Sequence, residues 1–383
     1  MSDISLEKPE TLGIDPEKLD ELAQRVRREV DAGILPSCQY ALARHGRLAA
    51  FEAVGACTPE SRFTIYSATK AFVASAAWLL LDAGDLQLER RVAEYIPEFG
   101  TNGKDVVTVE QVLLHTSGFP RAPLGPPKWA DRAERLAAFS AWRLNWEPGT
   151  QYEYHPTAAH WVLAELIERV SGIDYRDFIE QRVTRPLGLA RVLGIPVAEQ
   201  GDVLDVVEGG EPTSPDELEA VLGVRELDLG EVTDEALLLL NEPDVRAVGI
   251  PGGGGVTTAA TVALFYQELL HNTKGLWDPE NLANATGKVW TSLPDPLYRV
   301  PASRGLGVVI AGDDGKAPLR GFGHTQSPRT FGHNGAAGQI AWADPESGLS
   351  FCYLTNGHDL DIIRQGRRGV GITSRAARCA QSS

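Results

Sequence analysis

The sequence has only four cysteines and no long apolar run. The cysteines, which lack the close spacing of a metal site, are Cys38, Cys57, Cys352 and Cys379. We expect free, buried thiols, as in other chains without an export signal. The longest apolar runs, AAWLLLDAG and ALLLLNEP, fall well short of the roughly 20 residues that a membrane-spanning helix needs. The N-terminal stretch MSDISLEKPETLGIDPEKLDEL has no basic region followed by an apolar one, so we expect a cytoplasmic protein without membrane attachment.

Positive charge is also scarce. Lysine and arginine total 36 against 52 aspartates and glutamates, which gives a formal net charge of −16. This balance argues against a general affinity for nucleic acids or anionic membranes. The apolar fraction of 43% and the charged fraction of 23% are those of an ordinary globular protein. At 383 residues the chain exceeds a single hydrophobic core, so we expect two subdomains or one large unit.

Several catalytic motifs are absent. No serine has glycine at both −2 and +2, so there is no G-x-S-x-G nucleophile elbow. There is neither a GxxxxGK[ST] phosphate loop nor an HExxH zinc helix. The glycine run PGGGGVTT at 251–258 lacks the lysine of a phosphate loop and favours a crowded helix entry, with Thr258 or Thr261 as its cap. His155 and His160 are five residues apart, which does not suit metal ligation on one helix face. We expect no metal and no cofactor.

The order of predicted elements indicates an α+β fold. Asp15 and Pro16 predict a helix start, and His45-Gly46 predicts the turn of a hairpin. The pattern is then mainly helical to about residue 275, and a second hairpin turns around residues 344–348 before a final helix over about 359–378. We predict an antiparallel sheet flanked by helices and built from both chain ends, 1–66 and 276–383. A mainly helical lobe, 67–275, would be inserted, with the active site between the two parts.

Ser67 and Lys70 stand three residues apart in YSATK, where an extended run changes into a helical pattern. Residues three apart are neighbours on a helix, about 5–6 Å apart at Cβ. Lys70 can therefore accept the proton of the Ser67 hydroxyl, provided that burial keeps the amine neutral. The other interpretation is that Ser67 is an ordinary helix cap and Lys70 a solvated lysine.

Two further stretches favour the catalytic interpretation. The chain contains SATK (67–70), YHP (154–156) and HNG (333–335). Their order is that of the S-x-x-K, Y-x-N and K-T-G or H-x-G motifs of one hydrolase superfamily. Two intervening stretches also match that superfamily: LLHTSGFP (113–120) and PGGGG-TTAA. The chain thus resembles the class C β-lactamase and penicillin-binding-protein superfamily of serine hydrolases, particularly its esterase and D-aminopeptidase-like members. The resemblance runs from about residue 12 to about 358. It implies a β-lactamase/transpeptidase-like fold.

The resemblance also implies roles for the site residues. Ser67 would be the nucleophile, Lys70 its base, and Tyr154 the residue that shares the proton and delivers it to the leaving group, although Tyr152 could replace Tyr154. The N–H groups of Ser67 and Ala336 would form the oxyanion hole. The small residues Gly335, Ala336 and Ala337 would let a substrate carbonyl approach closely.

Two residues depart from the family pattern and bear on the substrate. Pro156 occupies the place of the family asparagine, and proline has no side-chain amide and no N–H. His333 replaces the lysine of K-T-G and, if it contacts the substrate rather than serving the structure, is mostly neutral at pH 7. A β-lactam or D-peptide would lose two anchors here, whereas a small neutral ester or lactone would lose none. We predict a carboxylesterase-like serine hydrolase whose partner is a small-molecule acyl substrate. An acyltransferase, an amidase, peptidase or β-lactam hydrolase, and a non-catalytic binding module remain alternatives.

Two other features of the chain allow more than one interpretation. Four tryptophans near the Tyr154 motif are either core residues or the lining of an apolar pocket: Trp129, Trp142, Trp146 and Trp161. The acidic segment 199–244, which includes Asp228, is either a solvated loop and helix face or a lid that favours cationic or neutral substrates. The sequence indicates no oligomeric state.

Overall fold

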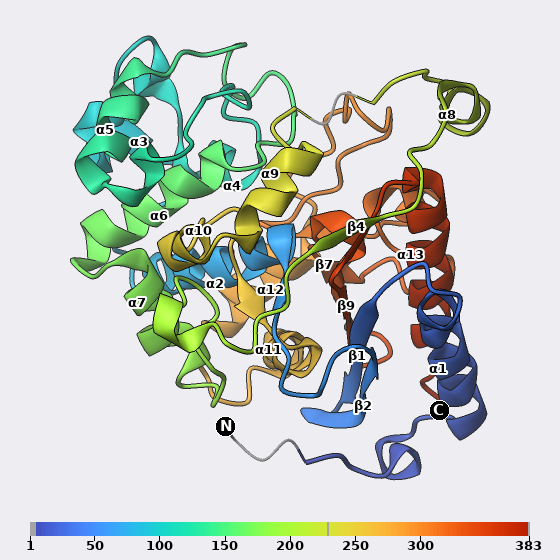
Figure 1. Cartoon of the computed structure of the whole chain (residues 1–383). Helices are drawn as coiled ribbons and strands as arrows, with labels where there is room; N and C mark the ends of the chain where they lie inside the picture. Colours follow the sequence, from blue (N-terminus) through green and yellow to red (C-terminus); the bar gives the residue numbers. More distant parts are fainter. Residues whose placement is uncertain (1–4, 228–229, 382–383) are drawn as a thin grey trace.

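The structure is a computed structural model that describes residues 5–227 and 230–381. Asp228 of the acidic segment therefore lies outside the described residues. Figure 1 shows a mainly helical part beside a sheet that carries the N-terminal and C-terminal helices. Within the described ranges, no helix combines the length and the apolar character needed to cross a membrane.

The main sheet has six strands in the order β2-β1-β9-β8-β7-β6, and each neighbouring pair is antiparallel. Its strands are β1 (Ser37–Arg44), β2 (Arg47–Gly55), β6 (Val309–Ile310), β7 (Phe331–Gly332), β8 (Ile340–Asp344) and β9 (Leu349–Thr355). Both predicted hairpins form, β1–β2 around His45-Gly46 and β8–β9 around residues 345–348. Because β1 pairs directly with β9, the two chain ends build one sheet, as predicted.

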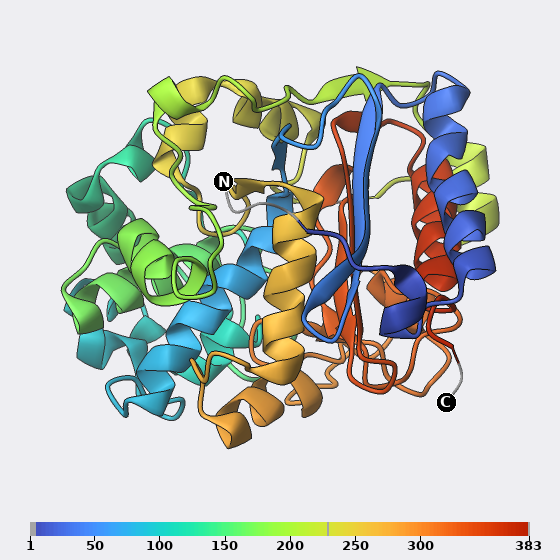
Figure 2. The same cartoon turned by 90° about the horizontal axis from the view of Figure 1, so that it is seen from below.

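Helices cover both faces of this sheet (Figure 2). Helices α1 (Pro16–Asp31) and α13 (Ile362–Ala376) pack together on one face, and α11 (Ala259–His271) lies on the other. Alternate residues of β1 follow the two faces: Tyr40 belongs to the core under α1 and α13, and Ala41 to the core on the α11 side. Strands β1, β8 and β9 are buried on both faces, which explains their nearly continuous apolar runs, whereas the edge strand β2 is partly exposed.

The predicted helix ends are largely those of the structure. The Asp15 side chain accepts hydrogen bonds from the backbone of Glu17 and Lys18 and so caps α1. The cap of α11 is Thr258, whose side chain accepts from the Thr261 backbone. Of the four cysteines, none is in a disulfide. Three are buried as predicted, but Cys57 is only partly buried because it lies beyond the end of β2.

The helical part is centred on α2 (Thr69–Asp82), which packs against α6 (Ala158–Ser171). Around these lie α3 (Val92–Tyr95), α4 (Val109–Leu113), α5 (Arg132–Ala141), α7 (Tyr175–Ile179), α10 (Pro243–Val248) and α12 (Pro279–Gly287). Three of the four tryptophans, Trp129, Trp142 and Trp161, are buried in its core, and Trp146 is partly exposed. The division of the chain into a sheet part and a helical lobe at residues 66 and 275 stays a prediction. Helix α11 lies within 67–275, but it packs on the sheet.

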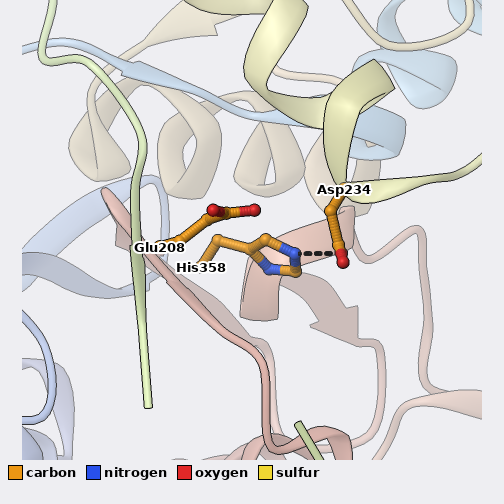
Figure 3. A group of neighbouring side chains, drawn as sticks. All are labelled: Glu208, Asp234 and His358. Atoms are coloured by element: carbon orange, nitrogen blue, oxygen red, sulfur yellow. Dashed lines mark hydrogen bonds and ion pairs between the residues drawn. The ribbon is translucent and has the colours of Figure 1, made fainter. Parts of the chain in front are cut away.

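The acidic segment 199–244 contains α8 (Pro215–Leu222), α9 (Asp234–Leu238) and a short strand, β4 (Val207–Gly209). Strand β4 pairs in parallel with β10 (Gly357–Asp359), and Glu208 lies opposite His358. His358 Nε2 is 2.7 Å from Asp234 Oδ1 (Figure 3). The segment is thus attached to β10 at two points, through a separate two-stranded sheet and through the contact of Asp234 with His358, which the expectation of a solvated loop and helix face did not include.

Candidate active site

Ser67 lies in a short 3-10 turn, Tyr66–Ala68, that leads directly into α2. The turn follows β3 (Phe63–Thr64), which pairs with β5 (Val256–Thr257). Tyr66 has a φ of 45°, a left-handed conformation that is strained for an aromatic residue. Its hydroxyl donates to Leu237 O at 3.2 Å, and this bond helps to hold the turn. The surrounding chain therefore fixes the backbone that presents the serine.

The Lys70 amine is fully buried and lies within reach of three oxygen atoms. Nζ is 3.2 Å from Ser67 Oγ, 2.7 Å from Pro156 O and 2.5 Å from Gly252 O. The two carbonyl oxygens can only accept hydrogen bonds. A neutral amine that donates its two N–H groups to them therefore directs its lone pair at the serine hydroxyl. This is the arrangement that a general base for Ser67 requires.

The surroundings of Lys70 favour the neutral amine. Burial lowers its pKa well below the ordinary lysine value, and the positive charge of Arg304 lowers it further. Glu231 opposes this shift, since its carboxylate raises the pKa of Lys70. Burial dominates the balance, and the lone pair of Lys70 is accordingly available below the usual titration range of lysine.

Tyr154 contacts the nucleophile from the other side. Its hydroxyl donates to Ser67 Oγ at 2.9 Å, whereas the Tyr152 hydroxyl accepts from Arg304 Nη2 at 2.6 Å. Of the two tyrosines, the structure therefore brings Tyr154 to Ser67. Burial raises the pKa of Tyr154, and the contacts with Ser67 and Arg304 act in the opposite direction. A buried, protonated phenol is suited to give its proton to a leaving group.

The segment that carries Gly335 and Ala336 lies against the serine turn. A Cβ built on Gly335 lies 2.2 Å from Ile65 O, two residues before Ser67, so only glycine allows this approach. In the described part of the chain, the backbone N–H groups of Ser67 and Ala336 donate to no other residue. Both are thus available to a substrate carbonyl oxygen, as an oxyanion hole requires.

Gly335→Ala is expected to lower kcat/KM by about 10² to 10³, the range seen when one oxyanion donor is lost. The added methyl group displaces Ala336 from the serine turn, because the Ile65 carbonyl is main chain and cannot rotate away. The measurement is steady-state ester hydrolysis, with circular dichroism to check folding. Gly366→Ala is the matched control, since a Cβ there meets no atom within 4 Å. An unchanged kcat/KM in Gly335→Ala would place the oxyanion hole elsewhere.

His333 is held by its own neighbours. Nδ1 lies 2.9 Å from Asn334 O, which fixes the proton on Nδ1 and leaves the Nε2 lone pair facing Arg304 Nη1 at 3.3 Å. Its ring centroid is 5.9 Å from that of Tyr154. Burial and Arg304 lower the pKa of His333 well below its ordinary value, so the ring is neutral. In this arrangement both ring nitrogens are occupied, and the contact that His333 makes toward the site is the one with the Tyr154 ring.

Sequence reasoning missed three groups around the site. Gly252 supplies a carbonyl to Lys70, and a Cβ on it would lie 2.6 Å from Pro156 O. Glu231 accepts from Thr157 Oγ1 at 2.6 Å and acts electrostatically on Lys70. Arg304 contacts Tyr152 and His333. The glycine run signalled close packing near Gly252, but nothing in the sequence distinguished Glu231 or Arg304 from other charged residues.

The potential metal ligands of the described chain do not lie at this site. Glu208, Asp234 and His358 offer ligand atoms within 4.8 Å of one another (Figure 3), but both carboxylates are exposed and His358 Nε2 is hydrogen-bonded to Asp234. Three buried histidines, His115, His155 and His160, lie close together, and the ring centroid of His115 is 4.9 Å from that of Tyr154. His155 accepts from the Phe119 N–H, and burial lowers its pKa to about 3. These histidines are neutral core residues of the site wall.

The antiparallel sheet with its flanking helices and the mainly helical part define a β-lactamase/transpeptidase-like fold, and Ser67 lies within it between a buried lysine and a tyrosine. The chain belongs to the Beta-lactamase family, whose model matches residues 22–368. The likeness to known proteins extends over most of the chain. The chain is 28% identical to the Esterase/beta-lactamase LipL of Mycobacterium tuberculosis, over 76% of this chain and 68% of that protein. It is 25% identical to an Escherichia coli K12 protein named provisionally as a D-alanyl-D-alanine carboxypeptidase, over 91% of this chain and 84% of that one.

A solved structure agrees with the fold. The crystal structure of a penicillin-binding-protein homologue from Caulobacter crescentus has a TM-score of 0.78 at 24% identity, and covers 95% of this chain and 98% of that one. The family and the fold predicted from the sequence are thereby confirmed. The relationship also supports the coarser prediction that the protein is a hydrolase.

Proposed function

We propose that the protein is a serine hydrolase that cleaves small neutral esters or lactones through an acyl-enzyme on Ser67. The observation that carries this proposal is the contact of one hydroxyl with two proton-transfer groups, Lys70 Nζ at 3.2 Å and Tyr154 Oη at 2.9 Å. A serine hydroxyl attacks poorly until a neighbouring base takes its proton. No comparable arrangement is needed to cap a helix.

The reaction follows from these contacts. Ser67 Oγ forms a bond to the acyl carbon while its proton passes to Lys70 Nζ, and the oxyanion accepts from the N–H groups of Ser67 and Ala336. The C–O bond to the alcohol then breaks as Tyr154 gives the alkoxide a proton, and Lys70 returns its extra proton to Tyr154. Water repeats the sequence on the acyl-enzyme and releases the acid.

The preference for neutral esters rests on Pro156 and His333. Pro156 presents no amide to a substrate, and its carbonyl is already bonded to Lys70. His333 is neutral and has both ring nitrogens occupied. Neither residue therefore anchors the amide or the carboxylate of a β-lactam or a D-peptide. The relatives' names include esterase, β-lactamase and carboxypeptidase, so family membership alone does not select among these acyl groups.

The test compares p-nitrophenyl butyrate with nitrocefin on the same enzyme preparation. We expect kcat/KM for the ester to exceed that for nitrocefin by at least about 10², the equivalent of losing one or two anchoring interactions. A burst of p-nitrophenol equal to the enzyme concentration would accompany slow deacylation. Efficient nitrocefin turnover without ester turnover would contradict the preference argued from Pro156 and His333.

Two further outcomes address the alternatives. With butyl alcohol or an amine added, free acid as the sole product under all conditions excludes an acyltransferase. No burst, no turnover and no covalent adduct with a fluorophosphonate would identify a binding protein that has kept the fold.

A further inference from the structure

Arg304 is an almost buried arginine beside the active site, and only 8% of it is exposed. Its Nε and Nη2 donate to the Tyr152 hydroxyl at 2.9 and 2.6 Å, and its Nη1 lies 3.3 Å from His333 Nε2. Since Nδ1 of His333 carries the proton, Nε2 accepts from the guanidinium. Three of the five N–H groups of Arg304 are therefore fixed by a tyrosine and a histidine.

The charge of Arg304 has no counter-ion among the residues that the structure describes. No carboxylate in the described part of the chain lies within the 4.0 Å ion-pair distance of its guanidinium. Other buried arginines do pair: Arg320 with Asp314, and Arg368 with Asp359. A buried cation that lacks a counter-ion is unfavourable for the free energy of folding. Its presence at the site therefore calls for a functional explanation.

The guanidinium lies against the two tyrosines. Its Cζ is 5.3 Å from the ring centroid of Tyr154 and 5.5 Å from that of Tyr152. At such a distance in a buried site, a fixed positive charge acts strongly on a phenol and on an amine. Arg304 favours the loss of a proton from Tyr154 and disfavours an extra proton on Lys70.

Other titratable groups face the same pair. Glu231 acts on Lys70 in the opposite sense to Arg304. His115 and His160 are neutral because burial lowers the pKa of each. Burial likewise keeps Tyr298 protonated by raising its pKa. Arg304 is therefore the positive charge that lies against Tyr154.

We infer that Arg304 is a positioning residue that supplies the fixed positive charge for proton transfer between Lys70 and Tyr154. The inference rests on the proposed function. When Tyr154 gives its proton to the leaving alkoxide, Arg304 stabilises the resulting phenolate, and it also destabilises the Lys70 ammonium, which then gives up its extra proton. The charge that His333 does not provide in the H-x-G motif thus comes from a different part of the chain. Because Arg304 is buried and largely occupied, its charge acts on Tyr154 rather than on a substrate carboxylate.

The test uses Arg304→Gln and Arg304→Lys, with Arg320→Gln as the matched control, because the Arg320 guanidinium contacts Pro301, Ala311 and Asp314 and none of the site residues. With p-nitrophenyl butyrate, we expect Arg304→Gln to lower kcat by about 10- to 100-fold while KM changes little, because removing a nearby charge alters proton transfer more than binding. Both limbs of the pH profile of kcat/KM should move to higher pH, by about one unit. Arg304→Lys keeps the charge, so its pH profile should lie close to that of the wild type. Arg320→Gln should leave the pH profile in place.

Three outcomes would overturn the inference. One is a pH profile of Arg304→Gln that superimposes on that of the wild type; another is an equal shift in Arg304→Lys and Arg304→Gln. The third is a loss that is confined to the KM of an anionic ester such as mono-p-nitrophenyl glutarate, because it would make Arg304 a substrate anchor. Thermal melting identifies a variant that fails to fold, and Arg304→Lys then carries the test.

The rate at which a fluorophosphonate labels Ser67, measured against pH, separates this inference from the proposed function. Labelling depends on removal of the serine proton and needs no ester turnover. If the wild type labels with a pH-dependent rate but hydrolyses no ester, the proposed substrate class fails. The shift of that labelling profile in Arg304→Gln then still decides the role of Arg304.

Discussion

Ser67→Ala is expected to lower kcat for ester hydrolysis by about 10⁴-fold or more, as in other enzymes that lose a serine nucleophile. The variant should also form no adduct with a fluorophosphonate, since the atom that is acylated is Oγ itself. Lys70 Nζ keeps its two carbonyl partners, Pro156 O and Gly252 O, so the fold of the site should survive. The measurement is single-turnover kinetics together with intact-protein mass spectrometry.

Ser75→Ala is the matched control, because Ser75 is a buried serine of α2, the helix that directly follows the turn of Ser67. Its Oγ donates to Phe72 O at 2.8 Å and contacts no group of the site. Its variant should keep kcat and the fluorophosphonate adduct. If Ser67→Ala retained more than about a tenth of the wild-type kcat, the acyl-enzyme mechanism would be wrong.

The fold was readable from local signals in the sequence. Asp15-Pro16 and His45-Gly46 act within a few residues, so their helix start and hairpin could be predicted without tertiary information. The pairing of β1 with β9 joins residues more than 300 positions apart, and it followed only from the order of strands and helices. Strand β4 could not be predicted, because it has three residues and its partner β10 comes about 150 residues later.

The candidate site was readable in part for the same reason. The spacing of Ser67 and Lys70 is a local helical relation, and the structure keeps it, with Nζ 3.2 Å from Oγ. The choice between Tyr152 and Tyr154 depends on which ring turns toward the serine, and the sequence allowed either. The acceptors of Lys70 are main-chain carbonyls of Pro156 and Gly252, so no side-chain type identified them. Arg304 is significant because no carboxylate among the described residues lies within ion-pair distance of it, and only the tertiary structure reveals that.

Lys70→Met is expected to lower kcat by about 10³- to 10⁴-fold, the upper part of the range for a lost general base and acid. Methionine keeps an apolar stem in the buried site but has no lone pair that can take the Ser67 proton at neutral pH. In the wild type, the acidic limb of kcat/KM should titrate below the ordinary lysine pKa of about 10.4, because burial and Arg304 lower the pKa of Lys70. Activity rises as pH rises through that pKa, since the neutral amine is the base. The small residual activity of Lys70→Met should no longer show this limb.

The matched control for this prediction is Lys104→Met. Lys104 is also buried, and its Nζ likewise donates to two carbonyls, Thr101 O at 2.7 Å and Trp142 O at 2.6 Å. Each variant leaves two carbonyls without their N–H donor, so each should lose stability by a similar amount, about 1–3 kcal/mol per unsatisfied group. A fall in kcat that accompanies only Lys70→Met is then a chemical effect, because the two thermal shifts are alike. If instead Lys70→Met kept kcat within tenfold and retained the acidic limb, Lys70 would not be the base. Tyr154, the other group within hydrogen-bond distance of Ser67 Oγ, would then have to take the proton as a phenolate.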